Sequence, residues 1–176
     1  MNYDDHILKI LVIGELGVGK TTAISRFVDG KFISNMKSTI GVDFSLKHLK
    51  YHENGKDIAN VALQIWDVAG EKRFRDILPV YIQGTKGIIA TFDSTSFNTL
   101  EALVDWFDKI DSLIKIDGIP IILMSTKHDL NPNMDTEIVK RFKEKNGLFN
   151  YFQTSSVSGE NIEDVFYSLA KKIVYS

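Results

Sequence analysis

Three glycines, a lysine and two threonines lie in a short stretch that directly follows an apolar run. The stretch reads VIGELGVGKTT from Val12 to Thr22, and it contains the pattern G-x-x-x-x-G-K-[ST]. In this pattern successive backbone N–H groups surround phosphates, the lysine reaches the β and γ groups, and the hydroxyl ligates Mg²⁺. We therefore expect a nucleotide phosphate site formed by Leu16, Gly17, Val18, Gly19, Lys20, Thr21 and Thr22.

An aspartate and a glycine follow a later apolar run, in WDVAGE. Ligands of open α/β sheets gather at the carboxyl ends of strands, where Asp67 would hold a water on Mg²⁺ and the Gly70 N–H would bond a γ-phosphate oxygen. A tight turn after a strand is the structural alternative for this segment. Thr39, in STIGVDF, offers a hydroxyl that completes a Mg²⁺ shell only when a γ-phosphate draws its loop in. The expected metal ligands are therefore Thr21, Thr39 and Asp67.

Two further polar segments carry groups that suit a purine base. In STKHDL, Asp129 can accept hydrogen bonds from the N1–H and the exocyclic amine of guanine, a pattern that adenine does not present. The stem of Lys127 can lie over the plane of the ring. The segment Gln153–Asn161 closes a second loop beside this site. Each segment also has a structural interpretation, as a solvated loop or as a helix start capped by Ser158.

The elements that must position these groups follow from the pattern of apolar residues. Apolar runs alternate with segments of helical period, which indicates βα units around a mostly parallel sheet. The expected strands are Ile7–Ile13, Asp43–Tyr51, Val61–Trp66, Gly87–Phe92, Ile119–Met124 and Tyr151–Phe152. The expected helices are Lys20–Val28, Asp135–Lys145 closed by Asn146–Gly147, and two with the apolar stripes Leu100, Leu103, Phe107, Ile110, Ile114 and Ile162, Val165, Phe166, Leu169, Ile173. Glu53-Asn54-Gly55 predicts a hairpin, so one edge pair is expected to be antiparallel.

Composition limits the classes of protein. The chain has 176 residues, of which 44% are hydrophobic, and we expect a single domain over residues 1–176. A net charge of -2 without a long Lys/Arg block disfavours a dedicated nucleic-acid binder. The absence of cysteine excludes disulfides, thiolate metal sites and cysteine-linked lipids on this chain. With no signal sequence and no membrane-spanning run, we expect a cytoplasmic protein without an anchor of its own, associated with membranes through partners or a missing tail.

The order of these motifs resembles the Ras superfamily of small GTPases over essentially the full chain. TIGVDF and LQIWDVAGEKRF are most similar to the Rab family. The resemblance implies a P-loop NTPase fold of the G-domain type, with a six-stranded, mostly parallel sheet, one antiparallel edge strand and about five helices. It implies GTP/GDP and Mg²⁺ as ligands, slow hydrolysis of GTP, and a role in signalling and vesicle trafficking. Expected partners of the monomer are effectors, exchange factors and GTPase-activating proteins.

The resemblance also implies roles for single residues. By position, Phe32 stacks against the guanine edge, Thr39 is the threonine of the switch I loop, and the Ser156 N–H reads the guanine carbonyl in a loop with Ser155 and Val157. Catalysis is assigned to Glu71, Lys20 and Gly70. An effector surface is assigned to Ile40, Gly41, Phe44, Trp66 and Tyr81, in which the three aromatic side chains form a triad.

Several positions depart from the family pattern. Glu71 stands where a glutamine usually orients the attacking water, Thr126 stands where the base motif usually has an asparagine, and Val157 replaces a lysine. Leu16 occupies the variable position that faces the γ-phosphate, and the Thr39 loop has no arginine to act as a finger in cis. The C-terminal cysteines that are prenylated in Rab proteins are missing from this sequence.

Three functions remain to be compared. The first is a GTP/GDP switch with slow hydrolysis, and the second is a GTP-binding interaction module with negligible hydrolysis. The third is an ATP-using kinase or ATPase, which the Asp129 motif disfavours and for which no lid arginines are found.

Overall fold

The computed structural model describes residues 5–53 and 56–176. Its centre is a six-stranded sheet in the order β2-β3-β1-β4-β5-β6. The strands are β1 (His6–Ile13), β2 (Val42–Glu53), β3 (Lys56–Val68), β4 (Gly87–Asp93), β5 (Ile121–Thr126) and β6 (Asn150–Gln153). Neighbours pair in parallel except β2 and β3, which pair antiparallel at the edge of the sheet. The expected sheet with one antiparallel edge strand is thereby confirmed.

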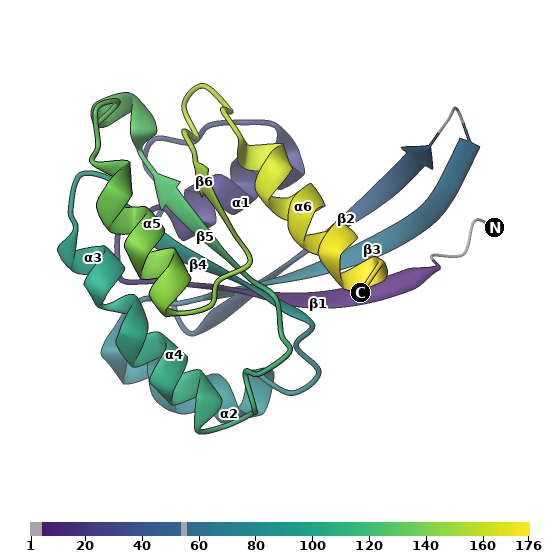
Figure 1. The fold of residues 1–176 in the computed structure, drawn as a ribbon, viewed down its shortest axis with the longest axis horizontal. Coiled ribbons are helices and arrows are strands. Elements are labelled where there is room, and N and C mark those ends of the chain that lie inside the picture. Colours follow the sequence, from purple (N-terminus) through teal and green to yellow (C-terminus); the bar gives the residue numbers. More distant parts are fainter. Residues whose placement is uncertain (1–4, 54–55) are drawn as a thin grey trace.

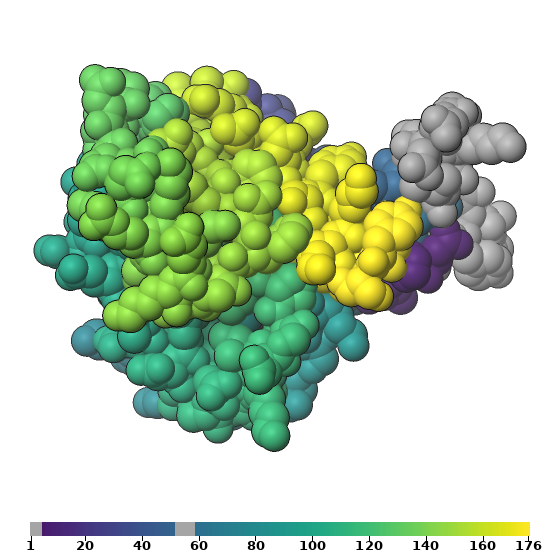
Figure 2. Space-filling model, viewed as in Figure 1, coloured from purple at the N-terminus to yellow at the C-terminus, as the bar shows by residue number. Residues whose placement is uncertain are grey.

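Helices flank the sheet on both faces (Figure 1). They are α1 (Lys20–Asp29), α2 (Leu78–Tyr81), α3 (Asn98–Glu101), α4 (Leu103–Asp111), α5 (Thr136–Lys145) and α6 (Ile162–Val174), with 3₁₀ turns η1 (Lys72–Ile77) and η2 (His128–Leu130). Only Ala102 separates α3 from α4, and its backbone is itself helical, so the two act as one of five helices in the described residues. Figure 2 shows residues of α5 in green and of α6 in yellow on the face of the molecule that is turned toward the viewer. None of the helices in the described part of the chain is long and apolar enough to cross a membrane.

Two apolar cores lie on opposite faces of the sheet. Along β1, Leu8, Ile10 and Val12 face α1 and α6, while Leu11 and Ile13 face α2 to α5. This alternation follows from the two-residue period of a strand that is buried on both faces.

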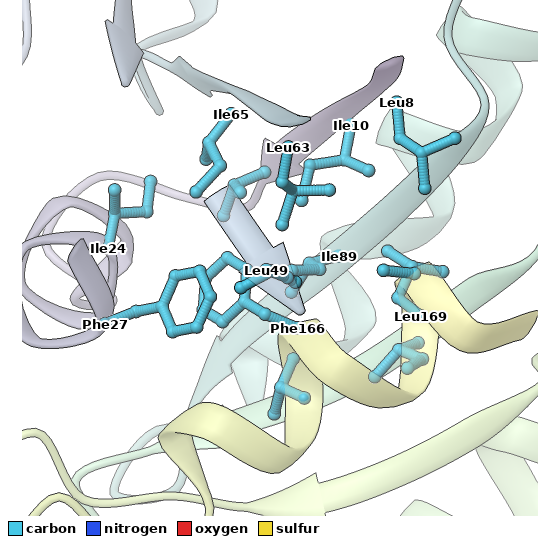
Figure 3. Packing of buried hydrophobic residues seen from close by; sticks show 14 of the residues in the cluster. Leu8, Ile10, Ile24, Phe27, Leu49, Leu63, Ile65, Ile89, Phe166 and Leu169 are labelled. Atoms are coloured by element: carbon cyan, nitrogen blue, oxygen red, sulfur yellow. The ribbon is translucent and has the colours of Figure 1, made fainter. Parts of the chain in front are cut away.

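An aromatic pair joins the two helices of the first core. Phe27 of α1 and Phe166 of α6 stack with ring centroids 4.0 Å apart and planes within 2° (Figure 3). Both side chains are almost fully buried. The pair therefore ties α1, which follows the phosphate loop, to the C-terminal helix.

The structure corrects several details of the sequence-based elements, and β3 begins at Lys56, before the expected Val61. The buried stripe of α3 and α4 includes Trp106, which is fully buried, whereas Phe107 and Ile114 pack only at its margin. The fifth strand begins at Ile121, after Pro120, and continues to Thr126. Proline has no N–H for a central ladder, which explains the later start. The pairing of Glu53 with Lys56 confirms the antiparallel edge, while the turn residues Asn54 and Gly55 lie outside the described residues.

Candidate functional site

The phosphate loop, residues 14–21, connects β1 to α1. Gly14 has a φ of 146°, and a Cβ there would lie 2.2 Å from the Thr91 carbonyl oxygen of the neighbouring strand β4. Gly19, with a φ of 98°, is the N-cap of α1. Glycine is thus required at Gly14 because the loop crosses β4 closely, and at Gly19 because the backbone enters the left-handed region.

Lys20 is the first residue of α1, and its side chain folds back under the loop. Its ammonium donates hydrogen bonds to the carbonyl oxygens of Gly14, at 2.8 Å, and Glu15, at 2.9 Å. Burial lowers the pKa of the Lys20 ammonium to about 8, although the charges of Asp67 and Glu15 act to raise it. A phosphate beside this ammonium would favour its charged form, so the site suits an anion.

Thr126 and Lys127, in the segment that was expected to read the base, bind two further carbonyl groups of the phosphate loop. The Thr126 hydroxyl donates a short hydrogen bond to the Val18 carbonyl, and the Lys127 ammonium donates to the Gly17 carbonyl at 2.9 Å. Lys127 also forms an ion pair of 2.5 Å with Asp93 at the end of β4. The C=O and N–H of a peptide unit point in opposite directions. Because these two carbonyls point toward Thr126 and Lys127, the N–H groups of the same peptide units point toward the inside of the loop, where a phosphate would lie. Thr126 therefore fixes the phosphate loop, and a single hydroxyl donor is enough for this role.

Two neighbouring cavities open on this edge of the sheet. The first, of about 250 Å³, is lined by Leu16, Gly17, Gly19, Lys20, Thr21, Thr22, Ser34, Met36, Lys37, Ser38, Thr39 and Gly70. The second, of about 210 Å³, is lined by Gly19, Thr22, Phe32, Ile33, Ser34, Thr126, Lys127, Asp129, Leu130, Ser156 and Val157. They share Gly19, Thr22 and Ser34, so a phosphate-sized and a base-sized space adjoin. Val18 and Ser155 are buried beneath them.

The three residues expected to bind Mg²⁺ come together at the first cavity, which Thr21 and Thr39 line. The hydroxyls of Thr21 and Thr39 lie 2.8 Å apart, and both donate to Oδ2 of Asp67, Thr39 at 3.3 Å and Thr21 at a shorter distance. The other oxygen of Asp67, Oδ1, is buried without a hydrogen-bond partner. Burial raises the pKa of the Asp67 carboxyl, although the hydrogen bonds from Thr21 and Thr39 and the charge of Lys20 act to lower it.

This donor set fits Mg²⁺. Hydroxyl and carboxylate oxygens are the ligands that this ion prefers, and a cation here would compensate the unpaired Asp67 oxygen. Among the described residues, no three His, Cys, Asp or Glu side chains gather to hold a metal ion. Phosphate oxygens and water would therefore have to supply the remaining ligands.

The carboxylate that was expected to read the base, that of Asp129, is held by the second loop. Asp129, within η2, accepts a hydrogen bond of 2.6 Å from the fully buried Ser155 hydroxyl. Phe32 and Val157 reach the same cavity while 42% and 53% exposed, so their side chains are free to contact a base. The arrangement gives one fixed acceptor with apolar walls around it.

Glu71 lies outside both sets of cavity-lining residues. Its carboxylate forms an ion pair of 2.7 Å with Arg73, and its side chain is 28% exposed. The preceding Gly70 is packed against the phosphate loop, where a Cβ would lie 2.2 Å from the Leu16 nitrogen. Sequence reasoning missed this use of Arg73, although an arginine two residues after the acid was a visible signal.

The expected effector residues adjoin one another on the surface. Trp66 contacts Phe44 edge-on, with ring centroids 5.3 Å apart, and Tyr81 at 5.7 Å. Ile40 is 80% exposed, and the Gly41 carbonyl accepts a hydrogen bond of 2.9 Å from the Ala69 N–H. The loop that carries Thr39 is therefore hydrogen-bonded to the residue that directly follows β3, the strand that carries Asp67.

Comparison with known proteins agrees with this geometry. The Ras family model matches residues 9–175. The Ras-related protein Rab-32 of Homo sapiens is 37% identical over 175 residues, covering 97% of this chain and 76% of that protein. Rab-32B of Dictyostelium discoideum is 35% identical, covering 97% of this chain and 66% of that protein. Rab-7L1 of Rattus norvegicus is 32% identical over 178 residues, covering 99% of this chain and 85% of that protein.

The match to the Ras model spans almost all the elements of the sheet, and the Rab relatives align over nearly the whole chain. The chain therefore belongs to the Ras family and is a Rab-like small GTPase, a guanine-nucleotide-binding switch that hydrolyses GTP.

Proposed function

We propose that this GTPase senses the γ-phosphate through Thr39. The observation that carries the proposal is the approach of the Thr39 hydroxyl to both Thr21 and Asp67. Thr21 and Asp67 belong to the phosphate loop and to β3, whereas Thr39 belongs to the exposed segment 29–41, here called switch I. A ligand that joins all three closes switch I onto the sheet, and its loss releases the segment.

The chain's own residues divide the work of hydrolysis. Lys20 binds the β and γ oxygens and neutralises charge that shifts toward the leaving group. Thr21, Thr39 and Asp67 would hold Mg²⁺, which when bound would supply further positive charge at the phosphates. The Gly70 N–H donates a hydrogen bond to the γ-phosphate. The Glu71 carboxylate breaks its ion pair with Arg73 and then orients the attacking water.

Guanine specificity is assigned to the second cavity. Asp129 accepts the two guanine donors, and the hydrogen bond from Ser155 supports this role because it fixes the carboxylate before the base arrives. Lys127 and Phe32 flank the ring, and the Ser156 N–H donates to the guanine carbonyl. An adenine nucleotide has no donors for the remaining acceptor positions of Asp129, so the binding of adenine nucleotides is strongly disfavoured.

Partners and location are also part of the proposal. We assign effector binding to Phe44, Trp66 and Tyr81, with Ile40 and Gly41 changing position as switch I closes. Exchange factors and GTPase-activating proteins would set the lifetime of each state. Residues 1–176 would act as one monomeric G domain in the cytoplasm, reaching membranes peripherally.

Removal of the Thr39 hydroxyl tests the sensor. In Mg²⁺, Thr39→Ala should lose roughly tenfold or more in affinity for a non-hydrolysable GTP analogue, because a bond to a charged group is worth about 1.5–3 kcal/mol. GDP affinity should stay within about threefold, and Thr39→Ser, which keeps the hydroxyl, should behave like the parent. Equal loss for both nucleotides, or no loss for either, would contradict the proposal. Chelation of Mg²⁺ should remove the difference between parent and variant.

A further inference from the structure

Three charged and aromatic side chains meet beside the phosphate loop without lining either cavity of the site. The Glu15 Oε1 atom accepts a short hydrogen bond from the Arg75 guanidinium and a second one, of 3.1 Å, from the Trp106 indole N–H. The Arg75 guanidinium also lies over the Trp106 ring, 4.3 Å from its centroid. The phosphate loop, η1 and α4 thus converge on one carboxylate oxygen.

The cluster is largely withdrawn from water. The Arg75 side chain is 11% exposed, the Glu15 side chain is 26% exposed, and Trp106 is fully buried. The Nε of Arg75 is buried without a hydrogen-bond partner. The guanidinium therefore depends on Glu15 and on the indole face for compensation, and loss of the carboxylate would leave a buried cation without its counter-charge.

A second contact joins the same two segments. Gly70 lies so close to the phosphate loop that a Cβ would approach the Leu16 nitrogen to 2.2 Å and the Glu15 carbonyl carbon to 2.4 Å. Gly70 and Arg75 are both part of segment 70–84, here called switch II, and both contact Glu15 or its neighbour. Residues 71–74 are therefore fixed at both ends, and Glu71 is among them.

The geometry points to Glu15 and Arg75 as positioning residues for hydrolysis. We propose that their ion pair, seated on Trp106, is a latch that holds switch II on the phosphate loop in the GTP-bound state. The latch presents Gly70 and Glu71 to the γ-phosphate, so this inference rests on the proposed roles of those two residues. Neither Glu15 nor Arg75 touches the nucleotide in this scheme.

Trp106 provides a direct reporter of the latch. The protein has two tryptophans, so Trp66→Phe leaves Trp106 as the only indole. Its emission should differ between the GDP state and the GTP-analogue state, because the hydrogen bond to Glu15 and the stacked guanidinium both change the surroundings of the ring. This signal depends on the position of switch II and requires no hydrolysis.

Glu15→Gln tests the proposal, since it keeps the size and one acceptor oxygen but removes the charge. We expect the Trp106 difference between nucleotide states to shrink at least threefold, and hydrogen exchange of residues 70–82 in the GTP-analogue state to approach that of the GDP state. Single-turnover hydrolysis should fall at least tenfold, while GDP affinity stays within about threefold. Glu137→Gln, which breaks the exposed ion pair with Lys140, is the matched control and should change none of these readouts.

Charge exchange separates a specific latch from general damage. In the double variant Glu15→Arg with Arg75→Glu, we expect partial recovery of exchange protection relative to either single variant, because the ion pair is restored while the Trp106 N–H loses its acceptor. Arg75→Lys, which keeps the charge without the planar fork, should give an intermediate Trp106 signal if the reversed pair does not fold. Parent-like protection and emission in Glu15→Gln would overturn the proposal, as would single and double variants that are equally impaired.

The roles of Gly70 and Glu71 are tested independently. Glu71→Leu should slow hydrolysis with an unchanged Trp106 signal. If Glu71→Leu hydrolyses GTP at the parent rate while Glu15→Gln loses protection, the latch stands and the assignment of Glu71 fails.

Discussion

A single methyl group at Gly70 should separate GTP recognition from GDP recognition. A Cβ at this position would lie 2.2 Å from the Leu16 nitrogen and 2.7 Å from the Glu15 carbonyl oxygen, whereas ordinary contact begins near 3.4 Å. In Gly70→Ala the backbone must therefore retreat by about 1.2 Å, the difference between 3.4 and 2.2 Å. Both obstructing atoms belong to the backbone, so rotation of a side chain cannot remove the clash.

The retreat removes the proposed Gly70 N–H bond to the γ-phosphate. Because that bond joins a donor to a charged acceptor, its loss should weaken binding of a GTP analogue by roughly 10- to 150-fold. A misplacement of about 1 Å can cost on the order of 100-fold in rate, so we expect hydrolysis to fall by that order. GDP has no γ-phosphate, and its affinity should remain close to that of the parent.

Fluorescent-nucleotide dissociation and single-turnover hydrolysis measure these effects. Gly84→Ala is the control, because Gly84 also lies in switch II and has open space around its Cβ position, although its φ is 78°. It should lower thermal stability through backbone strain, by roughly 1–2 kcal/mol, and leave hydrolysis unchanged. A Gly70→Ala variant with the parent's GTP-to-GDP affinity ratio would refute the reasoning.

Three further outcomes are expected. Asp129→Asn should shift preference from guanine toward xanthine nucleotides in a competition assay, since the new amide can donate to the xanthine O2; an unchanged preference would remove Asp129 as the base reader. Glu71→Leu should retain GTP affinity while single-turnover hydrolysis falls about tenfold or more, a barrier change of roughly 1.4 kcal/mol, and a parent-like rate would exclude Glu71 from the chemistry. Phe166→Ala should lose about 3–5 kcal/mol of unfolding free energy in denaturant titrations because it empties the stack with Phe27, and a loss below about 1 kcal/mol would mean that the core refills the space.

Local patterns explain which parts of the fold were predictable. The phosphate loop and the strand before it lie within a few residues of each other, so the glycine pattern and the apolar run report one continuous structure. Helix phase was harder, because the pattern of Leu100 and Leu103 is compatible with either Trp106 or Phe107 as the next buried residue. The structure buries Trp106 because its indole N–H reaches Glu15 and its ring carries Arg75.

Contacts between distant segments explain what sequence reasoning missed. Glu15 lies 60 residues from Arg75 and 91 residues from Trp106 along the chain. No spacing rule connects positions so far apart, and a carboxylate in a loop or an arginine in a turn is ordinary by itself. The sheet order brings these residues together, because β1 lies between β3 and β4 and each of the three segments follows one of those strands.

The number of buried contacts that a segment makes also determines whether it can respond to the nucleotide. Thr126 and Lys127 hold the phosphate loop to the base motif through hydrogen bonds to Val18 and Gly17, and the surrounding strands are buried. By contrast, residues 29–40 are exposed except for the half-buried Met36 and Thr39. Segments with few buried contacts open at low cost, whereas a braced sheet edge does not. The phosphate loop and the segment Thr126–Lys127 therefore form a braced frame, and we expect the ligand to gain most by recruiting Thr39 from the exposed segment that reaches this frame.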